Sequence, residues 1–201
     1  MATTTLTGLF PTYAQAQAAV RDLEAEGVYA DNISIVANNA DNAYDAPERV
    51  VDEPSAAGAG ASVGAVSGGA IGLLTGLGIM AIPGVGPVVA AGWLASTALG
   101  ALAGGAAGAA IGGLASALSE AGVSEADAHV YSEGVRRGGA LVVVKTDDTR
   151  ADIVQAVLDR NRRQDVAAVR STYEQGGWKT FDPDAAPWTS DQIRDERNRY
   201  L

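Results

Sequence analysis

The chain has 201 residues, of which 47% are hydrophobic and 19% charged, and this balance excludes an intrinsically disordered chain. It has no cysteine and a single histidine, His129, which excludes disulfides, thiolate metal sites and cysteine nucleophiles. The formal net charge of −10 argues against general nucleic-acid binding, because phosphate contacts need basic patches. The first residues lack the basic and apolar regions of a signal peptide, so we expect a cytoplasmic protein.

The first part of the chain predicts a strand, a helix and a second strand. Residues 3–10 alternate in polarity and are rich in Thr and Leu, which is typical of a strand. A capping box at Thr12 opens a helix that ends at Gly27. Residues 32–37 form the second predicted strand, and an acidic connector over 38–53 follows it.

The middle of the chain differs in composition. Between Glu53 and Glu120 lie 66 residues without an ionisable side chain, and they include 17 of the 25 glycines. A water-exposed segment of this length would carry charges, so we expect it to be buried against a partner. Small residues four apart form a groove along a helix that admits a second backbone, a register that a flexible linker lacks. We therefore predict two helices, 55–82 and 87–118, joined by a Pro-Gly turn as a glycine-zipper hairpin. The helix-packing glycines are Gly60, Gly64, Gly68, Gly72, Gly76, Gly92, Gly100, Gly104, Gly108 and Gly112.

The last part of the chain resumes the mixed pattern. Ser124 caps a helix that ends at 138–139, and the apolar run 140–146 suits a central strand. Thr149 caps a further helix, and 165–173 is predicted to be the last strand. Without the hairpin, this order is that of an α+β fold of the ferredoxin-like, split βαβ type. The expected domains are 1–53 (first half and connector), 54–119 (hairpin), 120–175 (second half) and 176–201 (tail).

Three segments form a recognisable combination. They are the strand–helix–strand start around Leu6–Phe10, the central glycine zipper, and residues 131–144, in which Gly-Val-Arg-Arg-Gly-Gly precedes a Val-rich strand. Together they resemble the bacterial general stress proteins, also described as heat-induced or low-temperature-induced stress proteins. The resemblance extends to about Tyr173, and it implies a stress-linked, non-enzymatic protein with no catalytic residues to carry over.

Two sequence motifs typical of enzymes occur, but neither lies in the structural context that its chemistry requires. Residues 60–64 match the G-x-S-x-G elbow and 76–81 match a loose dinucleotide fingerprint, but both lie in a glycine repeat and not between a strand and a helix. Glu125, His129 and Glu133 are spaced to share one helix face. We interpret them as a solvated face, because no further histidine or cysteine could complete a tight metal site. We predict no catalytic residue, cofactor or metal.

The C-terminal tail is rich in aromatic residues for a chain with 5% aromatics. Thr189 and Gln192 form a predicted capping box for a helix that ends at Tyr200. This helix is too short to be stable alone, so we expect the tail to dock, on its own domain or on a neighbouring subunit. The predicted anchors are Trp178, Phe181, Trp188 and Tyr200.

Two classes of function remain open. In both, the expected partner is a second copy of the chain, with no nucleic acid or small-molecule substrate. The hairpin either inserts into a lipid bilayer, with both ends on the cytoplasmic side, or is buried in a soluble self-assembling particle or filament. Acidic flanks such as Asp52 and Glu120 lack the usual basic anchors of a membrane protein. A small-ligand sensor is a third alternative that rests on fold analogy alone.

Overall fold

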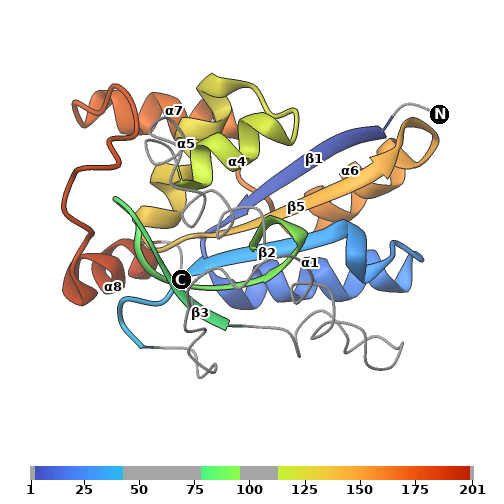
Figure 1. The fold of residues 1–201 in the computed structure, drawn as a ribbon, viewed down its shortest axis with the longest axis horizontal. Helices are drawn as coiled ribbons and strands as arrows, with labels where there is room; N and C mark the ends of the chain where they lie inside the picture. Colours follow the sequence, from blue (N-terminus) through green and yellow to red (C-terminus); the bar gives the residue numbers. More distant parts are fainter. Residues whose placement is uncertain (1–2, 43–77, 96–112, 200–201) are drawn as a thin grey trace, which may run out of the picture.

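A five-stranded antiparallel sheet lies at the centre of the α+β structure, a computed structural model that describes residues 3–42, 78–95 and 113–199 (Figure 1). The strand order is β1-β5-β2-β4-β3. The strands are β1 (Thr3–Phe10), β2 (Ile33–Asn38), β3 (Gly78–Ile82), β4 (Gly86–Gly92) and β5 (Ala140–Asp147). The helices are α1 (Tyr13–Ala25), α4 (Gly113–Glu120), α5 (Glu125–Arg136), α6 (Ala151–Arg160), α7 (Val166–Gln175) and α8 (Ser190–Asn198). Short 3₁₀ turns cover Ala30–Asn32 and Asp148–Arg150.

The central part of the sheet follows the sequence prediction. β1 and β2, which α1 connects, lie on either side of β5 and are both antiparallel to it. Val142 of β5 is opposite Gly8 of β1 and Ile35 of β2. Its apolar neighbours are fully buried, as a central strand requires. The predicted strands at 3–10, 32–37 and 140–146 are confirmed to within a residue or so at each end.

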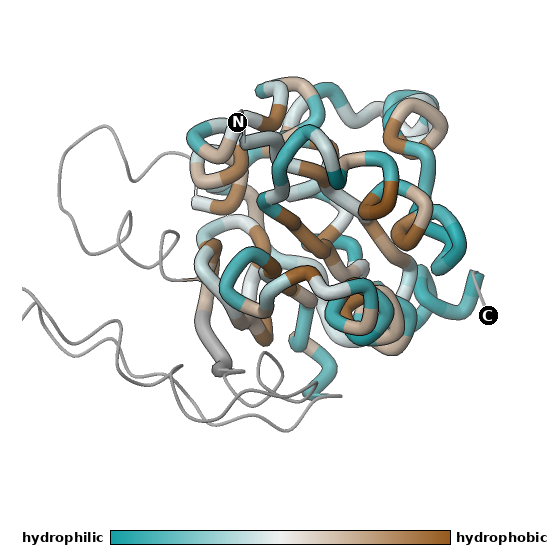
Figure 2. Tube along the Cα trace, turned by 90° about the vertical axis from the view of Figure 1, so that its right-hand side faces the viewer, coloured by the Kyte–Doolittle hydropathy of each residue, from teal (hydrophilic) through white to brown (hydrophobic). Residues whose placement is uncertain are grey.

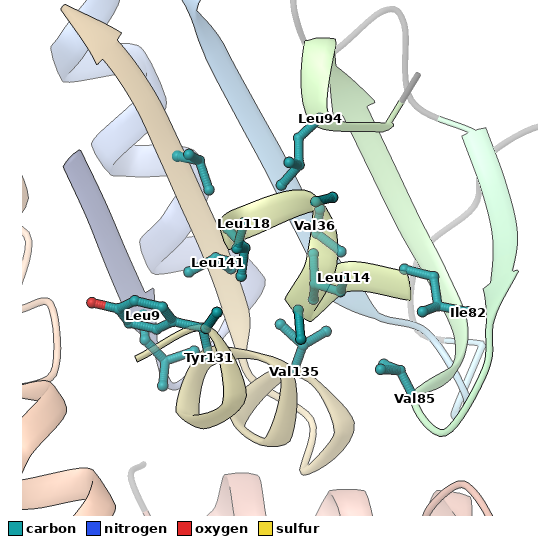
Figure 3. Packing of buried hydrophobic residues seen from close by; sticks show 14 of the residues in the cluster. Leu9, Val36, Ile82, Val85, Leu94, Leu114, Leu118, Tyr131, Val135 and Leu141 are labelled. Carbon is teal, nitrogen blue, oxygen red and sulfur yellow. The ribbon is translucent and has the colours of Figure 1, made fainter. Parts of the chain in front are cut away.

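Helices cover both faces of the sheet because successive strand residues point to opposite faces. Leu9 packs in a cluster with α4, α5 and α7, whereas the adjacent Phe10 packs in a second cluster with α1 and α6. Figure 3 shows Leu9, Val36 and Leu141 of the sheet facing α4 and α5. In Figure 2 the hydrophilic residues lie mainly on the outer turns of the helices. The result is a three-layer arrangement of helices, sheet and helices.

Three of the predicted helix caps form and one does not. Thr189 caps α8 in a capping box with Gln192. The Thr12 hydroxyl accepts a hydrogen bond from the Gln15 amide, and the Ser124 hydroxyl accepts one from the Asp127 amide, so these two predicted N-caps are also confirmed. The predicted cap at Thr149 is wrong. Residues 148–150 form a 3₁₀ turn, and α6 follows without a side-chain cap at Arg150.

The predicted last strand, 165–173, is also wrong, because these residues lie in α7. The carboxylate of Asp165 accepts hydrogen bonds from the amides of Ala167 and Ala168 and so caps a helix. Val169 and Tyr173, four residues apart, supply its buried face. The chain therefore lacks a second strand–helix–strand unit at this point, and the β3–β4 hairpin extends the sheet instead. The specific ferredoxin-like arrangement is not found.

The predicted helical hairpin is wrong on either side of its turn. Residues 78–82 and 86–92 are antiparallel strands, although 78–82 and 87–92 are predicted to be helical. In β4, Val88 and Ala90 face one core cluster whereas Val89 and Ala91 face the other, so the apolar run fits a strand buried on both faces. The Pro-Gly segment does form the expected turn, although it joins strands. Of the predicted helices, the structure describes helical conformation at 93–95 and in α4, whereas 55–77 and 96–112 lie outside the described residues.

Candidate functional site: the arginine–aromatic cluster under the tail

A buried carboxylate lies near the C-terminal end of α5. Glu133 is only 1% exposed, and its oxygens accept hydrogen bonds from Arg137 Nε at 2.7 Å and from an Arg136 terminal nitrogen at 3.4 Å. A buried charge is costly unless it is paired, and two arginines one helical turn away provide the pairing. The pair also fixes the direction of the Arg137 side chain.

Arg137 in turn lies against aromatic side chains. Its guanidinium carbon is 4.0 Å from the Tyr173 ring centroid and 5.1 Å from that of Trp188. Trp178 meets Tyr173 edge to face, with the centroids 5.8 Å apart. Planar guanidinium groups stack well on aromatic rings, so Arg137 connects α5, α7 and the tail.

Arg197 of α8 makes a second polar junction. It donates hydrogen bonds to the carbonyl oxygens of Gly138 and Asn38, each at 2.9 Å, and forms an ion pair with Asp41. The two side chains of this ion pair are 11% and 8% exposed. Ser190, at the start of α8, donates to the carbonyl oxygen of Ala40 at 2.7 Å. α8 is thereby attached to the residues at and just after the end of β2.

The tail also packs against the β3–β4 turn. A Cβ atom added at Gly84 would lie 2.7 Å from Pro183 Cα, and one added at Gly86 would lie 2.9 Å from Pro187 Cβ. Both glycines have positive φ angles. Glycine is therefore needed for the turn and for the close approach of the tail.

The space left between these elements is small. A pocket of about 10 Å³ lies between Arg137, Tyr173 and Arg197, which is room for about one water molecule. Its charged neighbours are already paired within the protein. The arrangement holds the tail in place and gives no support to the small-ligand alternative.

The predicted tail anchors divide into three groups. Phe181 is 3% exposed and belongs to the apolar cluster on the α4–α5 face, against which Trp178 is partly buried. Trp188 lies near Arg137. Tyr200 lies outside the described residues. In this structure the tail docks on its own domain.

Among the predicted helix-packing glycines, the structure describes only Gly92. Gly92 ends β4 with φ +89°, and an added Cβ would lie 2.2 Å from the Ile33 carbonyl oxygen. Its placement in a helix groove is therefore wrong, because strand pairing requires this glycine. The remaining nine glycines, at 60–76 and 100–112, lie outside the described residues.

The interpretation of Glu125, His129 and Glu133 as one solvated face is wrong for Glu133, which is buried. Glu133 is buried against the arginines, whereas His129 lies 3.9 Å from Glu125 and 3.2 Å from the Thr180 hydroxyl. Over 3–42, 78–95 and 113–199 we find no group of three or more His, Cys, Asp or Glu residues that could bind a metal. Across the same ranges, every helix falls short of the length and apolar character that a bilayer crossing demands.

Sequence reasoning did not single out Glu133, Arg137 and Arg197 as one cluster. In the sequence, the Arg-Arg-Gly-Gly stretch at 136–139 stands out only as part of the family resemblance. A glutamate one turn before two arginines is the available signal. The contact with Asp41 is 156 residues distant in sequence, and local spacing gives no indication of it.

The structure defines an α+β protein with an antiparallel sheet covered by helices and fastened by its own C-terminal tail. Residues 5–84 match the family model of the heat-induced stress protein YflT domain. This match confirms the resemblance to the heat-induced stress proteins over these residues, which are fewer than half of the chain. No curated protein and no solved structure gave a significant match to the chain.

Proposed function

We propose that this protein is a non-enzymatic stress-response protein that self-associates through two glycine-rich segments, 54–77 and 96–112. The observation that carries the proposal is the run from Glu53 to Glu120 without an ionisable side chain. The described part of this run is used within the domain, since β4 and α4 are largely buried in its core. The rest still has a composition that water-exposed segments avoid.

The four-residue glycine register supports the proposal. It persists at Gly60–Gly76 and Gly100–Gly112 after Gly92 is assigned to the sheet. Each glycine in a helix interior costs about 1 kcal/mol relative to alanine, so a repeated register needs a compensating contact. Close backbone packing against a second small-residue surface provides such a contact.

The buried residues on either side of the second segment favour self-association over a bilayer crossing. Leu94 and Leu114, which flank it, are both fully buried in the core, so a segment that crossed a bilayer here would contain at most the 17 residues 96–112. As an α-helix, 17 residues extend about 25 Å, which is less than the roughly 30 Å of a bilayer hydrocarbon core. The two segments are also separated by the β3–β4 hairpin in the sheet.

The test is the particle mass of register and off-register variants by sedimentation velocity. Gly68→Leu and Gly104→Leu place a branched side chain in the proposed groove, and we expect the large species to be lost. Ala70→Leu and Ala106→Leu are matched controls midway between two register positions, and we expect them to assemble like the wild type. An unchanged size distribution in both glycine variants would contradict the proposal.

Flotation with lipid vesicles distinguishes membrane insertion from self-association. Protein incubated with neutral and with anionic vesicles is centrifuged through a density gradient. Recovery of monomeric protein with the vesicles, without a large species in buffer, would favour the membrane alternative over self-association.

A further inference from the structure

The tail contacts three parts of the domain that are distant in sequence (Figure 1). Arg197 and Ser190 hold the backbone from Asn38 to Asp41, just after β2. Pro183 and Pro187 lie against the β3–β4 turn, and Arg197 also holds Gly138 after α5. Ile193 of α8 is fully buried, and an added Cβ at Gly138 would lie 2.8 Å from its Cγ2.

Two of these parts border the first glycine-rich segment. The described chain stops at Asn42, one residue after the Asp41 that pairs with Arg197, and resumes at the start of β3. β3 leads directly into the turn against which the tail prolines pack. A single docked segment therefore restrains both points at which residues 43–77 join the domain.

The way in which the tail is attached permits it to leave as a unit. Gly176 and Gly177 follow α7, and Gly177 has φ +86° with no atom within 4 Å of an added Cβ. The polar anchors of α8 to the rest of the domain are side-chain hydrogen bonds and an ion pair, from Ser190 and Arg197. Within the described ranges, no sheet pairing holds the tail to the domain. Segments held in this way open at lower free energy than the core they cover.

We propose that residues 178–198 form a releasable strap: when docked, it restrains the end of β2 and the β3–β4 turn, and its release promotes association with a second copy of the chain. The proposal rests on the self-association proposed above. It assigns Arg197 as the positioning residue of the strap, because this side chain contacts both the β2 end and the α5 end.

Strap release is measured by hydrogen exchange on the full chain. In Arg197→Ala and in Asp41→Asn, amides in 38–42 and 82–88 should exchange about tenfold faster or more, while those of β5 stay slow. Arg194→Ala is the matched control, because among the described residues the ion pair of Arg194 is with the exposed Asp191 of its own helix. The strap proposal is overturned if the amides exchange as fast in Arg194→Ala as in Arg197→Ala. It is also overturned if exchange of the β5 amides accelerates by the same factor as that of 38–42 in both Arg197→Ala and Asp41→Asn, since the tail then opens only with global unfolding.

Particle mass tests the effect on association. We expect a larger fraction of the large species in Arg197→Ala than in the wild type at equal concentration, and no change in Arg194→Ala. Equal assembly of wild type and Arg197→Ala, or loss of assembly in Arg197→Ala, would overturn the strap's role while leaving self-association intact. If neither protein assembles at any concentration, self-association itself fails, and the strap's role fails with it.

Discussion

Replacing Gly92 by alanine distinguishes the strand that is observed from the helix that the glycine register predicts. In a helix interior this substitution would stabilise the protein by about 1 kcal/mol. At the end of β4 it has the opposite effect. The positive φ of +89° costs an L-residue about 1–2 kcal/mol, and the new Cβ would lie 2.2 Å from the Ile33 carbonyl oxygen. Because that oxygen belongs to the backbone of β2, relief requires β2 and β4 to separate, which adds about 1–3 kcal/mol. We expect a total loss of about 3 kcal/mol or more.

Gly122→Ala is the matched control, because Gly122 has φ +93° and no atom within 4 Å of an added Cβ. It isolates the backbone cost, which we expect to be about 1–2 kcal/mol. Urea denaturation of the two variants and the wild type, followed by far-UV circular dichroism, gives the free energies of unfolding. The reasoning is refuted if Gly92→Ala is as stable as the wild type or no less stable than Gly122→Ala.

Three further predictions concern the core and the tail. Glu133→Ala leaves two partly buried arginines without their carboxylate and should lower the free energy of unfolding by about 3 kcal/mol. Asp191→Ala removes an exposed ion pair and should lower it by less than about 1 kcal/mol. Urea denaturation measures both changes. Burial raises the pKa of Tyr131 above its ordinary value of 10.0, so the contribution of the protonated phenol to stability is complete below pH 10 and falls as the pH rises further. Between pH 9 and pH 11, the free energy of unfolding should therefore fall more in the wild type than in Tyr131→Phe. An equal fall in the two proteins would contradict this prediction. Deletion of 176–201 removes the buried Phe181 and Ile193 and should lower the melting temperature by several degrees. The truncated protein should also bind more of a dye that detects exposed apolar surface. An unchanged melting curve would show that docking of the tail contributes nothing to stability.

The sequence predicts the elements whose signals are local. Alternation defines β1, the apolar run at 140–146 defines the central strand, and the caps at Thr12 and Ser124 define two helix starts. These signals depend on residues within a few positions of one another, so they survive in the folded chain.

The errors arise where long-range pairing decides the structure. Residues 86–92 are small and apolar, which suits a helix groove as well as a doubly buried strand. Pairing with β2 and β3 selects the strand. Residues 165–173 contain enough β-branched and aromatic residues for a strand, but Asp165 caps them into a helix. The Arg197–Asp41 contact joins opposite ends of the chain, which no local pattern encodes.

The position of β5 between β1 and β2 has a consequence for the nascent chain. The first two strands are complete by Asn38, yet the strand that separates them ends at Asp147. During synthesis, more than a hundred residues must leave the ribosome before β2 has its partner on the β5 side. The uncharged stretch from 54 to 119 is made within that interval, before the synthesis of α5 and β5, whose residues share a core cluster with β4 and α4. Chaperone dependence of folding should therefore be strongest for chains arrested before residue 147 and decline sharply once β5 has emerged.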